Sequence, residues 1–464
     1  MLFTAPAFAF LFLPFSLMFF MIFGKKQKRI CFLVISLAYY VLLNLNAPHN
    51  MVVLPMLLIY TFFAQITAEK YGKKWLTTLL CMVPFVALIG LRVLAYMRVP
   101  DYVYPVGTTL PTLCSISYIW DCRSEKDIKS RFLKLTSYIF FFPLMILGPF
   151  VSFNDFCSIS DEQNTQFSLM NVADGARLYM IGFVKRIAVG AVLIEAYQQI
   201  FAYSWDTQSF VTVILLLVLI YFGTFFSISG YYDMGVGVAR MFGFTIPEIN
   251  TNPFTIATLN EYSQGLFGSF RDWVKRYVLI PLFGSGHIPP LVSLLTYCIF
   301  IVSIIRSEPV ILLICVPLFV FSLATTRMGL DKRGDTRGKA GLRMVFGVLT
   351  MLVVSVLWVF ATMGNGMIFE DLAVDVGNAE YQTDMMLISF SWIKLLVVIV
   401  LGACTIIPRT KTAERITDGL PPTLRAVRDY SSMLIMLVIF LFTVVFFLPQ
   451  FEAFTHVPFN YIVM

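Results

Sequence analysis

The amino-acid sequence predicts an all-α, polytopic membrane protein. Of its 464 residues, 58% are hydrophobic and only 13% are charged, which excludes an ordinary soluble globular protein. The chain also contains charge-free stretches that reach the length of about 20 apolar residues needed to cross a bilayer as a helix. Because these stretches are continuously apolar rather than alternating, they favour a helical bundle over an outer-membrane barrel.

The membrane segments follow one another along the whole chain. The strongest candidates, which carry no charged residue, are 30–68, 75–91, 207–232, 344–369 and 430–451. Weaker candidates lie near 7–23, 134–153, 177–201, 291–305, 309–324 and 386–405. Together they predict roughly 11–13 membrane helices. Since no polar stretch is long enough for a soluble domain, we expect a single integral membrane domain over residues 1–464.

The distribution of positive charge predicts the orientation. Four basic residues within 25–29 follow the first apolar stretch, and the positive-inside rule places them in the cytoplasm and the amino terminus outside. No cleavage signal precedes them, so we expect this stretch to be a retained helix. The basic loops 70–74, 123–131, 327–343 and 409–428 are then cytoplasmic, and the acidic loop 155–162 lies outside. Topology thus accounts for the net charge of +7, and we expect membrane lipid, not nucleic acid, as a partner.

The cysteines and histidines do not suggest a metal site. The eight cysteines include no C-x-x-C pair, and most lie in apolar segments where they serve as small hydrophobic residues. His49, His287 and His456 stand in three different loops, without the spacing of metal ligands. We therefore expect no bound metal.

A polar, glycine-rich segment at 229–284 marks the candidate site. It begins at Ser229, passes Asn252 and ends just past Leu282. Irregular backbone at membrane depth is tolerated only where protein buries it or where it lines a water-filled cavity. We therefore expect this segment to be re-entrant and to adjoin a cavity.

Charged side chains in this segment support the same expectation. Asp233, Arg240, Arg271 and Asp272 would be costly in lipid, so they should face a cavity or one another. The alternative is that they lie at the membrane interface and orient the helices.

Five segments in a fixed order resemble a known family. They are Pro105-Val-Gly-Thr with Ser117-Tyr-Ile-Trp-Asp121, Phe141-Phe-Pro143 with Gly148-Pro149 and Asp155-Phe156, residues 229–244, residues 273–282, and Leu357-Trp-Val-Phe360. They are similar to segments of the membrane-bound O-acyltransferase superfamily, in the branch containing alginate O-acetyltransferase and the D-alanyl transfer protein of teichoic acid synthesis.

The resemblance implies a fold and an activity. Membrane helices would surround a central cavity that opens to the cytoplasm, admits an acyl thioester such as acetyl-CoA, and continues to the opposite face. The implied reaction is O-acylation, in most cases O-acetylation, of an exported polysaccharide or cell-envelope polymer. The resemblance also implies a bacterial inner membrane, and an extracytoplasmic acyltransferase or polysaccharide assembly proteins as partners. It implies no bound cofactor beyond the acyl donor.

The chain departs from the family pattern at its base. A family histidine takes the proton of the acceptor hydroxyl, and a gapless alignment puts Arg306 in its place. A second family histidine aligns with Leu266-Phe267, and an arginine pair before it aligns near Gln264-Gly265. Guanidinium cannot act as this base, because its pKa exceeds about 12 and it stays protonated.

Three explanations remain open from the sequence. The chain could be a non-catalytic scaffold or acyl-conducting subunit of a polysaccharide export or modification complex. Acyl transfer could instead survive with Arg306 as an electrostatic clamp on the donor and His287, Asp233 or a substrate group as the base. Arg306 could also be structural, paired with Glu308 or Asp233. A transporter is a minor alternative, since helices interrupted by glycine and proline are also found there.

Motif position then gives the candidate site residues. The catalytic candidates are Arg306, Asp233 and His287, and the cavity or acyl-donor candidates are Tyr231, Tyr232, Arg240, Asn252, Arg271, Trp273 and Tyr277. The tyrosines could equally be ordinary packing or interface residues.

Overall fold

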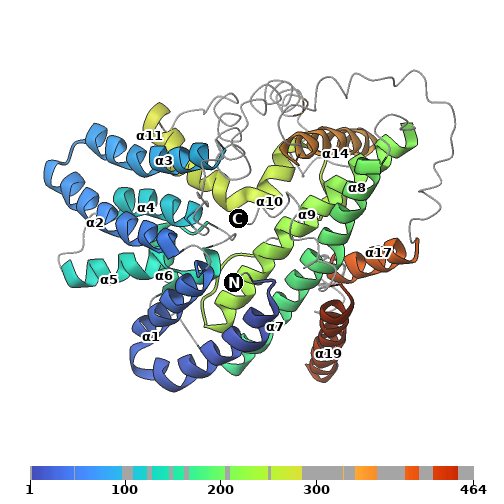
Figure 1. Cartoon of the computed structure of the whole chain (residues 1–464), viewed down its shortest axis with the longest axis horizontal. Coiled ribbons are helices and arrows are strands. Elements are labelled where there is room, and N and C mark those ends of the chain that lie inside the picture. The colour runs from blue at the N-terminus through green and yellow to red at the C-terminus, as the bar shows by residue number, and fades with distance from the viewer. Residues whose placement is uncertain are drawn as a thin grey trace.

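The structure is a computed structural model of the chain, shown in Figure 1. It describes residues 3–45, 48–96, 108–122, 128–145, 150–160, 167–203, 210–248, 252–284, 325, 328, 340–362, 392–406 and 422–447. Every regular element within these ranges is a helix, which confirms the all-α class. The number of membrane helices stays a prediction, because the candidate segments 291–305 and 309–324 lie outside the described residues.

The helices are arranged in two groups. Their bounds are η1 Phe8–Phe12, α1 Leu13–Leu43, η2 Pro48–Val52, α2 Val53–Tyr71, α3 Lys74–Tyr96, α4 Thr109–Asp121, α5 Ile128–Ile139, η3 Phe142–Leu144, α6 Phe153–Ser160, α7 Leu169–Val184, η4 Lys185–Ala191, α8 Val192–Tyr203, α9 Phe210–Met241, η6 Pro253–Thr255, α10 Leu259–Val274, η7 Lys275–Leu279, α11 Ile280–Phe283, α14 Ala340–Thr362, α17 Trp392–Ile406 and α19 Pro422–Phe446. In Figure 1 the blue and cyan helices α2 to α5 form one group, and the green helices α7, α8 and α9 form the other. The yellow helix α10 lies between them.

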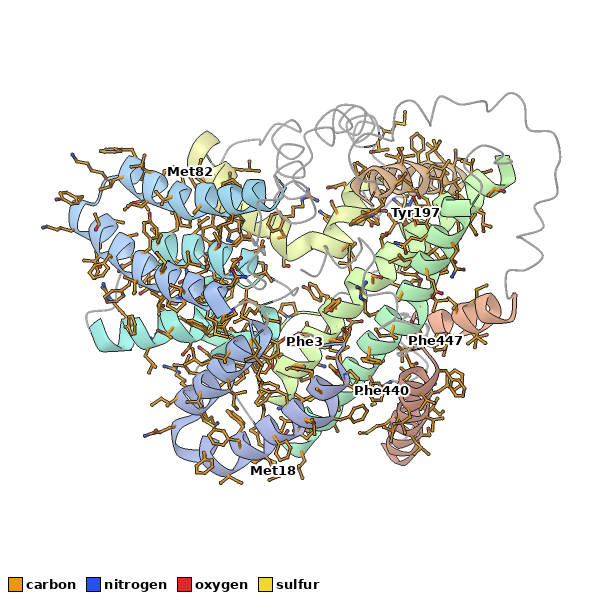
Figure 2. The ribbon with its side chains drawn as sticks, viewed as in Figure 1. Phe3, Met18, Met82, Tyr197, Phe440 and Phe447 are labelled. Carbon is orange, nitrogen blue, oxygen red and sulfur yellow. The ribbon has the colours of Figure 1, made fainter. Side chains whose placement is uncertain are left out.

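Several helices suit a lipid environment. Within the described part of the chain, three are long and apolar enough to cross a membrane, namely Asn50–Tyr71, Thr212–Met241 and Gly341–Val359. Large apolar side chains are exposed along the outside of the molecule, and Met18 on α1 and Met82 on α3 are examples at its edge (Figure 2). Phe3, in contrast, is fully buried. Because water would penalise so much exposed apolar surface, lipid is the solvent of this surface, and the chain is a multi-pass membrane protein.

The centre of the second group is a close contact between α7 and α9. A Cβ atom added at Gly182 would lie 2.5 Å from the carbonyl oxygen of Gly230, and one added at Gly175 would lie 2.6 Å from that of Gly237. Small residues allow membrane helices to approach at this distance. In this contact the two backbones therefore touch.

A π-helix keeps the glycines in register along this contact. Gly175 and Gly182 are seven residues apart, whereas Gly182 and Gly190 are eight apart. The π-helix η4 spans Lys185–Ala191 and accommodates an extra residue in its wider turn. Gly190 consequently still faces α9, where an added Cβ would lie 2.4 Å from Oγ of Ser227.

The expected irregular backbone after Ser229 is wrong for the first part of that segment. Helix α9 continues without a break to Met241, and its glycines serve the contact with α7 instead of a bend. The helix ends at Met241, and Gly243 follows with a φ of 88°, the left-handed conformation that favours glycine. There the N–H of Phe244 bonds to the carbonyl of Ala239 and the N–H of Gly243 to that of Arg240, which is a Schellman cap.

The membrane segment expected at 134–153 is also wrong as one continuous helix. Helix α5 ends at Ile139, and Phe141, with ψ of 89°, is not helical. Pro143 follows closely, and proline both lacks an N–H and restricts the residue before it. The chain therefore turns here and brings residues 150–155 back toward α10.

Candidate functional site

A polar cavity lies between α10 and the segment 150–155, which leads into α6. Its volume is about 410 Å³. Its described lining consists of Phe150, Ser152, Asp155, Tyr232, Pro247, Glu248, Gln264, Gly265, Gly268, Ser269, Asp272, Trp273, Arg276 and Tyr277. Three of the segments that carry the family resemblance contribute to this lining, through Asp155, Tyr232 and Tyr277, and those segments are far apart in the sequence.

Helix α10 supplies one wall because its small and polar residues share a face. Gln264, Gly265, Gly268, Ser269 and Asp272 recur at the spacing of one helical stripe. The π-helix η7 then continues the chain directly and adds Arg276 and Tyr277 to the wall.

The amino-terminal end of α10 is fixed by caps and by α14. The Thr258 side chain accepts a hydrogen bond from the N–H of Glu261 at 3.1 Å. The Glu261 carboxylate accepts from the N–H of Ala257 at 2.8 Å and binds Arg343 of α14 at 2.8 Å. A second link joins the Trp358 indole N–H to the Tyr262 hydroxyl at 3.1 Å. Because the carboxylate of this buried pair is also hydrogen-bonded, the position of α10 is well defined.

Three of the sequence-predicted residues line the cavity. Tyr232 reaches it from α9, and Trp273 and Tyr277 reach it from α10 and η7. The Trp273 ring stacks on Phe270 with centroids 5.9 Å apart and meets the edge of Phe150 at 5.5 Å. Trp273 is therefore held between an aromatic ring of its own helix and one from the opposite wall of the cavity.

Tyr231 and Asp233 do not line this cavity, although they flank Tyr232 in sequence. Asp233 is 1% exposed and its carboxylate lies 2.8 Å from Nζ of Lys185 in the contact between α9 and η4. The Tyr231 ring faces the Arg186 guanidinium at 5.1 Å. Lys185 and Arg186 are partners that the sequence analysis did not identify.

The remaining predicted residues hold the backbone around the site or lie outside the described ranges. Arg240 pairs at 2.6 Å with Glu248, which does line the cavity. Arg271 donates a hydrogen bond to Asn260 within α10, and Asn252 caps η6 by accepting from the N–H of Phe254 at 3.0 Å. Arg306 and His287 lie outside the described residues.

Charged residues are prominent in the lining, and of these the sequence analysis named only Asp272 as one that should face a cavity. Asp155, Glu248 and Asp272 contribute carboxylates, and Arg276 is the one cation in the described lining. Asp155 and Arg276 stand inside motifs that carried the resemblance, and that position was the available signal. Gln264 and Gly265, which align near the family's arginine pair, also line the cavity.

Tyr277 connects the cavity to a buried carboxylate. Its hydroxyl donates to Oδ2 of Asp121 at 2.5 Å and accepts from Oγ of Ser117 at 3.0 Å. Asp121 ends α4, which with 13 residues is too short to span a bilayer. Burial raises the pKa of the Asp121 carboxyl above its ordinary value, and the hydrogen bond from Tyr277 and the charge of Arg276 partly offset that rise.

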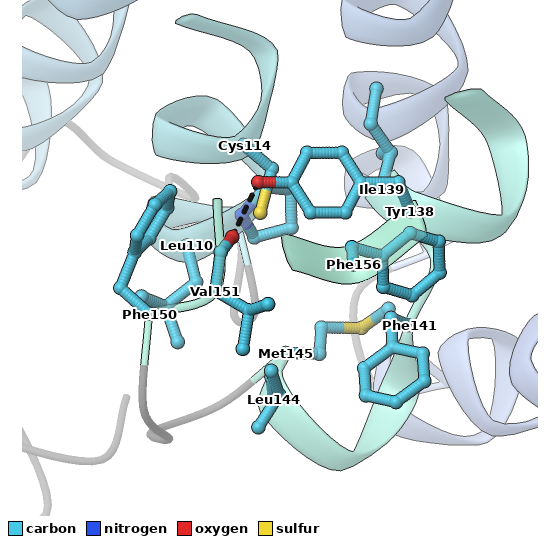
Figure 3. A pocket seen from close by; sticks show the side chains of 11 residues that line it. Leu110, Cys114, Tyr138, Ile139, Phe141, Leu144, Met145, Phe150, Val151 and Phe156 are labelled. Atoms are coloured by element: carbon cyan, nitrogen blue, oxygen red, sulfur yellow. Dashed lines mark hydrogen bonds between the residues drawn. The ribbon is translucent and has the colours of Figure 1, made fainter. Parts of the chain in front are cut away.

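A second, apolar pocket is also lined by Phe150 (Figure 3). Its volume of about 20 Å³ is room for about one water molecule. Above it, the Tyr138 hydroxyl donates to the carbonyl of Val151 at 2.6 Å. This hydrogen bond fixes Val151 in the segment 150–155, which forms the far wall of the large cavity. The small pocket itself has too little room for a substrate.

Comparison with known proteins identifies the family. Residues 32–288 match the membrane-bound O-acyltransferase family, so the match includes the whole described lining of the cavity and ends before Arg306. The protein named probable alginate O-acetylase AlgI from Pseudomonas fluorescens is 22% identical over 304 residues, which cover 61% of this chain and 58% of that protein. The protein of the same name from Pseudomonas aeruginosa gives the same identity and coverage over 316 residues.

A relative with a different substrate in its name matches equally well. The peptidoglycan O-acetyltransferase of Helicobacter pylori is 22% identical over 338 residues, which cover 61% of this chain and 62% of that protein. The chain thus spans about three fifths of the length of the relatives it matches. These relatives confirm the expected resemblance to the branch containing alginate O-acetyltransferase. From the match over more than half of its length, the chain belongs to the membrane-bound O-acyltransferase family.

Proposed function

We propose that this protein transfers an acetyl group from a thioester donor, acetyl-CoA, to a hydroxyl group destined for an exported polysaccharide or cell-envelope polymer. The observation that carries the proposal is the convergence of three family segments on one polar cavity. Asp155, Tyr232 and Tyr277 are distant in sequence and line the same space of about 410 Å³. A chain kept only as a scaffold would have no need to maintain an open cavity at that point.

The chemistry of the lining suits a hydroxylated acceptor. Three carboxylates, two serine hydroxyls and a glutamine amide offer hydrogen bonds to hydroxyl groups, and Trp273 offers a flat apolar surface. The described lining carries more negative than positive charge, which disfavours the phosphates of coenzyme A within it. The donor's uncharged thioester end can enter while its phosphates stay outside.

The proposal includes a location and partners. The protein would lie in the inner membrane with its amino terminus outside, as the positive-inside rule indicates. An extracytoplasmic acyltransferase or polysaccharide assembly proteins would pass the acetyl group to the polymer. A polymer as the final acceptor is supported by the names of the relatives, an alginate O-acetylase and a peptidoglycan O-acetyltransferase.

The test is the O-acetyl content of the exported polysaccharide and cell wall, measured by proton NMR. A deletion strain would be complemented with wild type, with Arg306→Ala or with empty vector. We expect deletion to remove O-acetyl groups and wild type to restore them. Unchanged O-acetyl content on deletion would contradict acetyl transfer and favour a non-catalytic role.

The Arg306→Ala arm separates the explanations for that residue. Loss of O-acetyl groups at a normal protein level would place Arg306 in the reaction as a clamp on the donor. Loss of the protein itself would identify a structural residue.

A further inference from the structure

A chain of hydrogen bonds connects the cavity wall with Asp121. The N–H of Phe153 donates to Oγ of Ser117 at 3.0 Å, and Oγ of Ser117 donates to the hydroxyl of Tyr277 at 3.0 Å. Tyr277 in turn donates its own proton to Oδ2 of Asp121 at 2.5 Å. Each donor points the same way, so the chain is polarised from α6 through α4 and η7 toward the carboxylate.

This arrangement leaves the Tyr277 hydroxyl able to accept another hydrogen bond. A phenol hydroxyl can donate one hydrogen bond, and here it donates that bond to Asp121. Its oxygen also accepts, and Ser117 uses only one acceptor position. Because Tyr277 lines the cavity, a bound hydroxyl group could occupy the other position.

Asp121 is placed behind Tyr277 and not in the cavity itself. Its side chain is 5% exposed, and it is absent from the described lining. The charged or titratable groups that face it are Tyr277 and Arg276 of η7, with Nη2 of Arg276 at 3.8 Å, and Asp155 of α6. A buried carboxylate with a raised pKa is a better proton acceptor than an exposed one.

We propose that Asp121, acting through Tyr277, is the base that deprotonates the acceptor hydroxyl in this protein. The assignment rests on the proposed function. As the acceptor oxygen attacks the thioester carbonyl, its proton passes to the oxygen of Tyr277 while the Tyr277 proton passes to Asp121. The new carbon–oxygen bond replaces the carbon–sulfur bond, and the proton returns by the same path to the leaving thiolate. No redox change and no further reactant is needed.

The other carboxylates suit this role less well. Asp233 forms an ion pair with Lys185 at 2.8 Å in the helix contact and does not line the cavity. Asp155 is exposed and accepts a hydrogen bond from Ser152 at 2.5 Å. Asp121, in contrast, combines a buried side chain with a hydrogen bond from Tyr277, which lines the cavity.

The experiment follows transfer of radiolabelled acetyl groups from acetyl-CoA to the polymer fraction of membrane vesicles from the deletion strain. The vesicles would carry wild type, Tyr277→Phe, Asp121→Asn or Asp121→Glu at matched protein levels. We expect Tyr277→Phe and Asp121→Asn to lower the rate by about 10²-fold or more, the usual contribution of a general base. Asp121→Glu should restore part of the rate, because it keeps a carboxylate.

A matched control and a pH profile separate catalysis from folding. Tyr179→Phe removes another buried hydroxyl, which donates to the carbonyl of Phe3 at 2.7 Å in the helix contact, and should leave the rate unchanged. The wild-type rate should rise with pH through the pKa of Asp121 and then level off, because the base must be ionised. The residual rate of Asp121→Asn should lack that rise, because the variant has no carboxyl group to ionise at that position.

The outcomes distinguish the two proposals. Active wild type with a fully active Tyr277→Phe variant would overturn the base assignment alone. An unchanged pH profile in Asp121→Asn would do the same. Wild-type vesicles that transfer no label would overturn the proposed function and the assignment with it.

Discussion

In the contact between α9 and the helix before it, polar side chains are buried against one another, whereas in the cavity beside α10 they line open space. Tyr231, Tyr232 and Asp233 are consecutive on α9, yet only Tyr232 lines the cavity. Tyr231 and Asp233 instead pack against Arg186 and Lys185. Successive residues of a helix point about 100° apart, so one motif supplies two environments. A motif in this protein therefore marks both packing and chemistry.

The two regions also differ in how much space they leave. At Gly175, Gly182, Gly230 and Gly237 in the helix contact, an added Cβ would meet backbone atoms at 2.5–2.7 Å. In the cavity wall, a Cβ added at Gly268 would meet nothing within 4 Å. Substitutions at the contact should thus change folding, and substitutions at the wall should change activity.

The largest expected effect is Gly182→Leu in the helix contact. The new side chain would collide with the carbonyl of Gly230 and the N–H of Met234, which cannot move independently of α9. The loss in folding free energy should be larger than that of ordinary overpacking, which is about 1–3 kcal/mol. We expect no folded protein in the membrane, as judged by immunoblotting and by size-exclusion chromatography in detergent. Gly90→Leu is the control, because Gly90 is exposed on α3 with nothing within 4 Å of its added Cβ.

The next effect concerns the buried pair beside that contact. Lys185→Met leaves the carboxylate of Asp233 without its cation, and removing one partner of a buried pair typically costs about 3–5 kcal/mol. The unfolding midpoint in detergent should fall accordingly. The double variant Lys185→Met with Asp233→Leu should recover much of the loss. A double variant as unstable as the single one would show that the pair is not what stabilises this contact.

The smallest effect is expected at the edge of the cavity. Arg240 and Glu248 form an ion pair at 2.6 Å, with side chains 27% and 35% exposed. Pairs accessible to solvent contribute at most about 1 kcal/mol. Arg240→Ala should therefore lower the free energy of unfolding, measured in detergent, by no more than about 1 kcal/mol. A loss comparable with that of Lys185→Met would mean that this edge is as tightly integrated as the helix contact.

Sequence patterns predicted the class of fold and the segments that build the site. Long apolar stretches imply membrane helices regardless of their neighbours, so the all-α class followed directly. The role of the glycines at Gly230 and Gly237 did not follow, because a glycine can bend a chain or admit a second helix. Only the position of α7 decides between them.

Within the site, the sequence located motifs better than individual roles. Trp273 and Tyr277 were assigned to the cavity and do line it. Asp121 is the last residue of one of these motifs, but the sequence did not predict its contact with Tyr277, which lies 156 positions away. Such a contact depends on how α4 packs against η7, which no local pattern encodes.

The central claim is that acetyl transfer takes place in the cavity beside α10. The most direct test is the O-acetyl content of exported polymer, per amount of folded protein, in the deletion strain carrying Gly268→Leu or Gly90→Leu. The Cβ of leucine at position 268 would meet nothing within 4 Å, and its side chain would occupy part of the cavity. We expect transfer to fall about tenfold or more, since small misplacements of reacting groups cost up to about 10²-fold. Gly90→Leu should transfer normally. Normal O-acetyl content with Gly268→Leu would contradict the claim and move the reaction elsewhere in the protein.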